Sequence, residues 1–222
     1  MTSRADRVLA ELSPLEAPMK ELGFTLRASG KLRFERRDGR KSSLGMRLFW
    51  ILIHRSSASA PPGFFLGWNV FARPDPAYQP LGVALDPTGT SLKRIVHTSS
   101  RQIPGWKSHR YSDCSAESED FRLDHPDYIR DVRPLLRENL LVGARFILEL
   151  SGDLRRAADF AASQPGPASA ISAIELYLHL GDAHAARTVL AQARLHSEWT
   201  RWSTLDPTWK RLGERLTPKL VP

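Results

Sequence analysis

The chain has 222 residues and a formal net charge of +8, with 41% hydrophobic and 25% charged residues, proportions that are ordinary for a globular protein. Its longest uninterrupted apolar run, residues 48–53, is far too short to cross a membrane, so we expect no membrane partner. The first residues lack the apolar core of a secretory signal, and the single cysteine excludes an intramolecular disulfide framework and a cysteine-based zinc site. We therefore expect a cytoplasmic protein.

The positive charge is confined to the first half of the chain. Residues 1–112 hold 18 Lys and Arg against 8 Asp and Glu, whereas residues 113–222 hold 14 against 16. A basic domain attracts an acidic protein, a nucleic acid or an anionic membrane, and charge alone does not choose between them. Arginine supplies most of the excess, which is also typical of a GC-rich bacterial genome.

An amphipathic helix is predicted at the N-terminus, over residues 3–22. Its apolar residues recur at spacings of three and four, which places them on one face of a helix. Pro14 and Pro18 predict a kink or two short helices, because proline removes a backbone donor. Gly23 is typical of a helix end.

Strand-like segments follow the helix. Alternating apolar and polar residues, or short apolar runs, predict strands at residues 24–27, 32–35, 44–54, 64–72 and 92–98. Asp38 and Gly39 are typical of a tight hairpin turn. Residues 48–53 are apolar on both parities and predict a central strand. We expect an α+β fold in which the N-terminal helix packs on an antiparallel sheet of four to five strands, forming a domain over residues 1–112.

The second half of the chain has helical periodicity. A polar loop is predicted at residues 99–119, and the apolar residues after it recur with a period of 3.6. Asp124 or Asp127 is expected to cap the first of these helices, and Pro134 to interrupt it.

A repeated corner is recognisable in this helical half. Gly152 and Asp153 are followed 29 residues later by Gly181 and Asp182, each time between a leucine-rich and an alanine-rich stretch. The glycine is expected in a left-handed helix end and the aspartate as the cap of the next helix. We expect an α-helical region of helical hairpins over residues 120–222.

No catalytic or metal-ligating residue and no cofactor is identified in the sequence. The seven histidines lack the spacing of a metal site. Cys114 has acidic neighbours, Asp113 and Glu117, which oppose formation of a nucleophilic thiolate. The group Asp-His-Pro-Asp at residues 124–127 gathers a histidine between carboxylates, for which helix capping is the favoured interpretation.

The basic hairpin is the candidate partner-binding region. Residues 27–55 hold nine Lys and Arg against two acids, and the residues expected to contact a partner are Arg33, Arg37, Arg40 and Lys41. Alternation along the strand directs Arg33 and Arg37 to solvent and Phe34 to the core. The basic and aromatic residues are therefore expected on opposite faces or in different parts of the strand, which gives little support to a base-stacking platform.

The first half of the chain also resembles a known type of domain. A helix ends in the pair Gly23-Phe24, and an aromatic-x-Arg strand follows at Phe34-Glu35-Arg36. Residues 5–100 are in this respect similar to small bacterial α+β domains of unknown function, some of which lie beside polymorphic toxins and are suspected immunity proteins. The resemblance implies no active-site residue.

Three classes of function remain open from the sequence. The first is a non-enzymatic protein–protein interaction module, immunity-like or scaffolding, with an acidic partner. The second is a nucleic-acid-binding module that uses the basic hairpin from Arg33 to Arg55. The third is an enzyme whose site is assembled from residues scattered along the chain.

Overall fold

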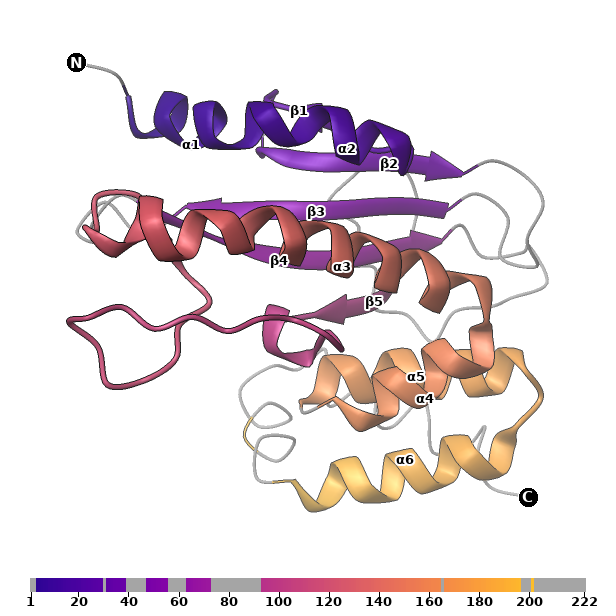
Figure 1. Cartoon of the computed structure of the whole chain (residues 1–222). Coiled ribbons are helices and arrows are strands. Elements are labelled where there is room, and N and C mark those ends of the chain that lie inside the picture. Colours follow the sequence, from indigo (N-terminus) through magenta and orange to yellow (C-terminus); the bar gives the residue numbers. More distant parts are fainter. Residues whose placement is uncertain are drawn as a thin grey trace. The chain divides into compact units, whose positions relative to one another are not determined.

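The computed structural model describes residues 3–29, 31–38, 47–55, 63–72, 93–164, 166–196 and 201. They form the predicted α+β fold, with N-terminal helices, an antiparallel sheet and then further helices (Figure 1). The chain divides into two compact units, each built from three segments: Met1–Arg37, Leu48–Asn69 and Thr98–Glu149 in the first, and Asp38–Arg47, Val70–His97 and Leu150–Pro222 in the second.

Two short helices, α1 (Arg4–Leu12) and α2 (Glu16–Glu21), replace one long N-terminal helix. The 3₁₀ turn between them contains Pro14, so the predicted kink is confirmed. Ser3 and Asp6 form a capping box, in which each side chain accepts the other residue's backbone N–H at 3.1 Å. Gly23 has a φ of 79°, the left-handed conformation expected at the helix end.

The sheet contains the predicted strands in sequence order. They are β1 (Thr25–Arg27), β2 (Arg33–Asp38), β3 (Arg47–Arg55), β4 (Gly63–Ala72) and β5 (Lys93–Thr98). An additional strand, β6 (Phe121–Arg122), pairs antiparallel with the first residues of β4. The sequence did not predict β6 because two residues carry no recognisable alternation. Gly39, half of the predicted hairpin turn, lies outside the described residues.

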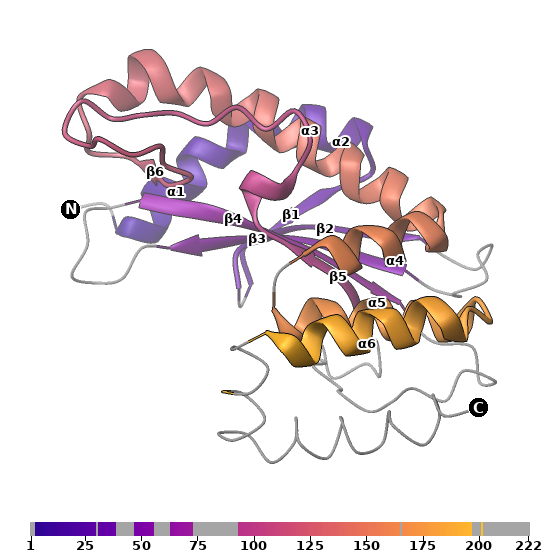
Figure 2. The same ribbon diagram turned by 90° about the horizontal axis from the view of Figure 1, so that it is seen from below.

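The hydrophobic core of the first unit lies between the sheet and three helices. Figure 2 shows α1, α2 and α3 (Arg133–Gly152) on the same side of β1 to β4. Large buried side chains from both layers fill the space: Val8, Leu12, Met19, Phe24, Phe34, Phe49, Phe64, Trp68, Phe121 and Ile147. Burial of such side chains is the main source of stability in a domain of this kind.

The third helix begins differently from the prediction. One turn of π-helix, η3 (Tyr128–Val132), leads directly into α3, which continues through Pro134 without interruption. Proline is tolerated there because the first-turn N–H groups of a helix have no intrahelical partner. Asp127 occupies the N-cap position, as one of the two alternatives predicted, but its side chain makes no capping bond and instead accepts the backbone N–H of Ser112 at 2.7 Å. Asp124 does not cap the helix and forms an ion pair with Arg7.

The polar loop before η3 is held against α3. The buried amide of Asn139 accepts the backbone N–H of Lys107 and donates to the carbonyl of the same residue, both at 2.9 Å. A further backbone bridge pairs His109 with Ser118. The predicted loop is therefore confirmed, and its path is fixed by bonds to backbone groups.

The second unit contains the hairpins α4 (Leu154–Ser163), α5 (Pro167–His179) and α6 (Ala183–Leu195), with α5 packed against both neighbours. Asp153 caps α4 and Asp182 caps α6, as predicted, by accepting backbone N–H groups at 3.0 and 2.9 Å. Gly181 is left-handed with a φ of 76°. Gly152 does not have the predicted left-handed conformation, because it is still the last residue of α3.

An ion-pair network joins these three helices. Arg155 of α4 bonds Asp182 at 2.6 Å and Asp159 at 3.2 Å, and its guanidinium lies 5.1 Å from the ring centroid of Tyr177. The Tyr177 hydroxyl donates to Asp159 at 2.7 Å, and burial raises its pKa to about 12. Within the described part of the chain, no helix is both long and apolar enough to span a membrane.

Candidate functional site

Two of the four predicted partner-binding residues lie on β2, on either side of a buried carboxylate. Arg33 Nε donates to Glu35 Oε2 at 3.0 Å, and Arg37 Nε donates to Glu35 Oε1 at 2.9 Å. The indole Nε1 of Trp50, on β3, donates to the same carboxylate at 3.1 Å. Arg40 and Lys41 lie outside the described residues.

The solvent-facing side of β2 is therefore less exposed than the alternation suggested. Glu35 is only 6% exposed, although it shares a parity with Arg33 and Arg37. Burial by itself would raise the pKa of Glu35, but hydrogen bonds from the two arginines outweigh burial and hold the pKa below its usual value. Glu35 is thus a fixed anion that orients two cations.

Basic and aromatic side chains lie together on both faces of the sheet, so the expected separation was wrong. The Arg33 guanidinium lies 4.7 Å from the ring centroid of Trp50. On the opposite face, the Arg36 guanidinium lies 5.9 Å from the ring of Phe49 and donates to the Leu22 carbonyl at 2.7 Å. Arginine can cover an aromatic ring because its stem is apolar and its charge is attracted to the ring.

Two further cations extend the positive charge beside Arg33. Arg27 on β1 is the direct cross-strand partner of Arg33 and therefore shares its face. Lys31 precedes β2 and is exposed. Together with Arg37 these residues form what we call the basic face: Arg27, Lys31, Arg33 and Arg37. Arg33 and Arg37 bind the buried carboxylate of Glu35, whereas Arg27 lies directly opposite Arg33, a position in which like charges repel.

A pair of stacked rings lies on the same side of the sheet. His54 is four residues beyond Trp50 on β3 and so shares its face. The rings of His54 and Phe65 are 4.7 Å apart and nearly parallel, at 10°. Phe65, on β4, remains 40% exposed. Burial, and secondly the charge of Lys31, lower the pKa of His54 and so favour its neutral form.

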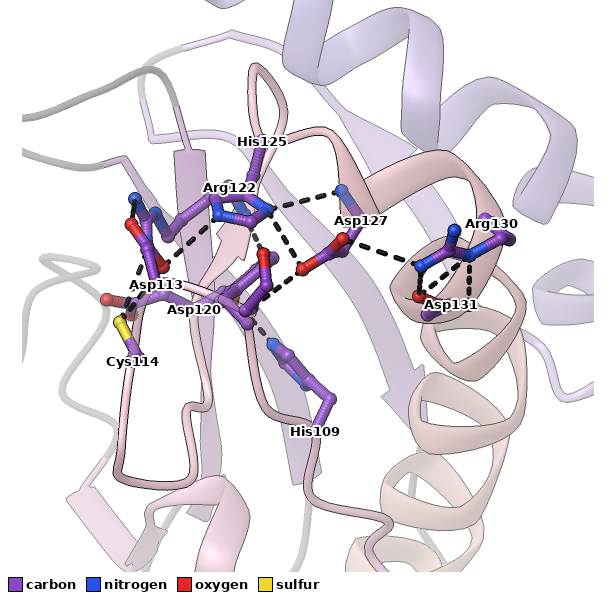
Figure 3. Close-up of polar contacts among 11 residues, drawn as sticks. His109, Asp113, Cys114, Asp120, Arg122, His125, Asp127, Arg130 and Asp131 are labelled. Atoms are coloured by element: carbon purple, nitrogen blue, oxygen red, sulfur yellow. Dashed lines mark hydrogen bonds and ion pairs between the residues drawn. The ribbon is translucent and has the colours of Figure 1, made fainter.

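A second group of polar residues stabilises the loop before η3 (Figure 3). Arg122 of β6 forms a bidentate ion pair with Asp113, at 2.8 and 2.7 Å. His125 Nε2 lies 3.2 Å from the same carboxylate, while His125 Nδ1 accepts the backbone N–H of Asp127 at 3.2 Å. The hydrogen bonds of Arg122 hold the pKa of Asp113 well below its usual range.

Tyr111 connects this group to the protein interior. Its hydroxyl donates to the Asp120 carbonyl at 2.8 Å and accepts the Arg122 N–H at 2.6 Å, and burial raises its pKa to about 12. His109 Nε2 donates to the Asp120 carbonyl at 2.8 Å. Burial lowers the pKa of His109. These bonds hold two stretches of the loop together, and His109 Nδ1 is buried without a hydrogen-bond partner among the described residues.

Cys114 is not activated as a nucleophile. Its Sγ donates to Asp113 Oδ1 at 3.2 Å, and this hydrogen bond is the main cause of a raised thiol pKa. The expectation that Asp113 opposes thiolate formation is confirmed. Among the described residues, no group of three or more His, Cys, Asp and Glu could hold a metal ion.

No family model, curated protein or solved structure matches the chain. Function has to be inferred from the residues themselves. In the loop group, Arg122 pairs with Asp113, and Arg130 pairs with Asp127 and Asp131, so aspartates outnumber arginines there. The basic face, in contrast, holds four cations and one buried carboxylate. The sequence had indicated a basic hairpin, but it could not show that Arg27 and Lys31 lie beside Arg33 or that His54 and Phe65 share their face.

Proposed function

We propose that the chain is a non-enzymatic protein-binding module that receives an acidic partner on its basic face. The observation that carries the proposal is that Arg33 and Arg37 both bind the buried carboxylate of Glu35, while Arg27 and Lys31 lie beside Arg33 and add two further positive charges. A surface with unbalanced positive charge attracts acidic partners and accelerates their association. Because Glu35 fixes two of the guanidinium groups, less side-chain entropy is lost when a partner binds.

The ionisable groups of the loop favour binding over catalysis. General acid–base catalysis needs a group whose pKa lies near the working pH. Here the pKa of Asp113 is lowered and that of Cys114 is raised, so both are moved away from neutrality. His109 donates its Nε2 proton to a backbone carbonyl.

The most specific form of the proposal is an immunity-type role, in which the chain neutralises an acidic protein encoded by an adjacent gene. Its support is the resemblance of residues 5–100 to domains found beside polymorphic toxins, together with the basic face. This form requires a tight complex whose affinity falls as the salt concentration rises.

The proposal is tested by measuring the affinity of the chain for the products of the adjacent genes over a salt series. The double variant Arg27→Glu with Lys31→Glu should lose at least about tenfold in affinity and most of the salt dependence. A matched control reverses two exposed arginines of α3, Arg137→Glu and Arg145→Glu, which makes the same change in net charge. Equal losses in both double variants, or no complex with any neighbouring product, would refute the proposal.

A nucleic-acid-binding role for the region from Arg33 to Arg55 is the second candidate. The observation in its favour is that cations and aromatic rings share one face, as in sheets that stack single-stranded bases. Titration with a short oligonucleotide separates the two candidates. Binding that is strong at about 50 mM salt and falls steeply above it would favour this second function.

A further inference from the structure

The basic face contains an exposed apolar anchor. Phe65 is 40% exposed, and one side of its ring is covered by His54 at 4.7 Å. Its ring is therefore held in place while part of its surface stays open. A large apolar side chain that is held in place yet partly open to solvent can act as an anchor in an interface.

The anchor lies next to the cations of the basic face. Lys31 is close enough to His54 for its charge to lower the pKa of that ring. The N–H of Ile53 donates to the Leu32 carbonyl at 3.0 Å, which places residues 31–33 beside residues 52–54. An apolar centre surrounded by charged groups is the usual arrangement of an interface hot spot, in which the rim keeps water from the centre.

Gly67 keeps the stacked pair in its geometry. A Cβ atom at residue 67 would lie 2.5 Å from His54 Nε2 and 2.9 Å from Cδ2 of the same ring. The absence of a side chain there lets the imidazole lie flat over the strand and support Phe65. The stacking of His54 on Phe65 thus depends on Gly67, which leaves space for the imidazole ring.

The arrangement fits an acidic peptide better than a nucleic acid strand. Single-strand binders stack successive bases on several open rings. Trp50, another aromatic ring on this face, is only 7% exposed and is covered by Arg33. One open ring with cations on one side of it, towards β1 and β2, suits a single anchor side chain with acidic neighbours.

We propose that Phe65, supported by His54, binds an aromatic side chain from an acidic segment of the partner, whose carboxylates pair with Arg27 and Lys31. This inference rests on the proposed function and adds the chemistry of the partner segment. The segment combines several Asp or Glu residues with one Trp or Phe at its centre. Stacking on Phe65 provides specificity, because charge alone does not distinguish one acidic chain from another.

Two labelled synthetic peptides test the inference on the full chain by fluorescence anisotropy. Both are rich in Asp and Glu and differ at one central position, which is Trp in one and Ala in the other. We expect the Trp peptide to bind about 3- to 10-fold more tightly. Phe65→Ala should bring the affinities of the two peptides to the same value, while Phe65→Tyr should retain the preference.

The controls separate the two proposals. Ile129→Ala removes another exposed apolar side chain, 71% exposed on η3, and should leave the Trp preference intact. If Arg27→Glu with Lys31→Glu weakens both peptides but Phe65→Ala does not alter their ratio, the anchor is refuted and the proposed function stands. If neither peptide binds at about 50 mM salt, the proposed function is contradicted as well. An oligothymidylate that binds more tightly than both peptides would overturn the assignment to a protein partner.

Discussion

A methyl group added at residue 143 would collide with the centre of the first unit. Gly143 lies in the middle of α3, where an ideal Cβ would be 2.3 Å from Cη2 and 2.5 Å from Cζ2 of Trp68. Trp68 is fully buried, and its Nε1 donates to Ser100 Oγ at 3.3 Å. The ring cannot move away without breaking this bond and disturbing the packing around it.

The change in the free energy of unfolding caused by Gly143→Ala is the difference between two opposing contributions. Carbon atoms in contact are about 3.5–4.0 Å apart, so the added methyl group overlaps the indole by more than about 1 Å. Overpacking of this kind costs about 1–3 kcal/mol, whereas alanine in place of glycine inside a helix gains about 1 kcal/mol. Because the obstacle is a rigid buried ring, we expect the upper end of the cost and a net loss of about 2 kcal/mol for Gly143→Ala.

Urea denaturation followed by tryptophan fluorescence measures this loss. Gly152→Ala is the matched control, since Gly152 belongs to the same helix and has no atom within 4 Å of its ideal Cβ. The control should be neutral or more stable by up to about 1 kcal/mol. In a double variant, Trp68→Phe should reduce the cost of Gly143→Ala, because the two positions interact. A Gly143→Ala protein as stable as the control would refute the reasoning.

Three other changes have defined outcomes. Glu35→Gln removes the anion between two arginines and should lower the free energy of unfolding by about 1–3 kcal/mol in urea at neutral pH. Asn139→Leu removes both bonds to the Lys107 backbone and should cost about 1–3 kcal/mol, with faster hydrogen exchange confined to the loop as the distinguishing sign. Folding lowers the pKa of His109, chiefly by burial, so the unfolded chain binds this proton more readily. The stability contributed by neutral His109 is fully present above the unfolded pKa of about 6.5 and is lost as the pH falls below it, by at most about 1.4 kcal/mol per pH unit. His109→Asn should make this loss of stability with falling pH smaller. Denaturation curves at about pH 7, 6 and 5 measure the difference.

The local elements were predictable because their signals are short-range. The spacing of apolar residues in α1, the alternation in β2 and the apolar run of β3 each follow from the geometry of one element. Asp153 and Asp182 were predicted as helix caps because a cap bonds a backbone group only three residues away.

The errors concern side chains whose partners lie far away in the sequence. Asp124 and Asp127 have the local features of helix caps, but Arg7 and the Ser112 backbone bind them instead. The backbone N–H of Ser112 is 15 positions from Asp127, and the guanidinium of Arg7 is 117 positions from Asp124. The fold brings these donors to the two carboxylates, and no local sequence pattern indicates such contacts.

In the candidate site too, the local features could be predicted from the sequence, whereas the contacts between strands could not. The sequence by itself determined that residues 27–55 are rich in arginine and lysine and contain strands, because composition and the alternation of polar and apolar residues can be read directly from it. Only the tertiary structure decided that Glu35 is buried between two arginines and that Trp50 closes over it. Strand pairing sets side chains from β1, β2, β3 and β4 next to one another, and the resulting charge and exposure depend on neighbours that no single segment contains.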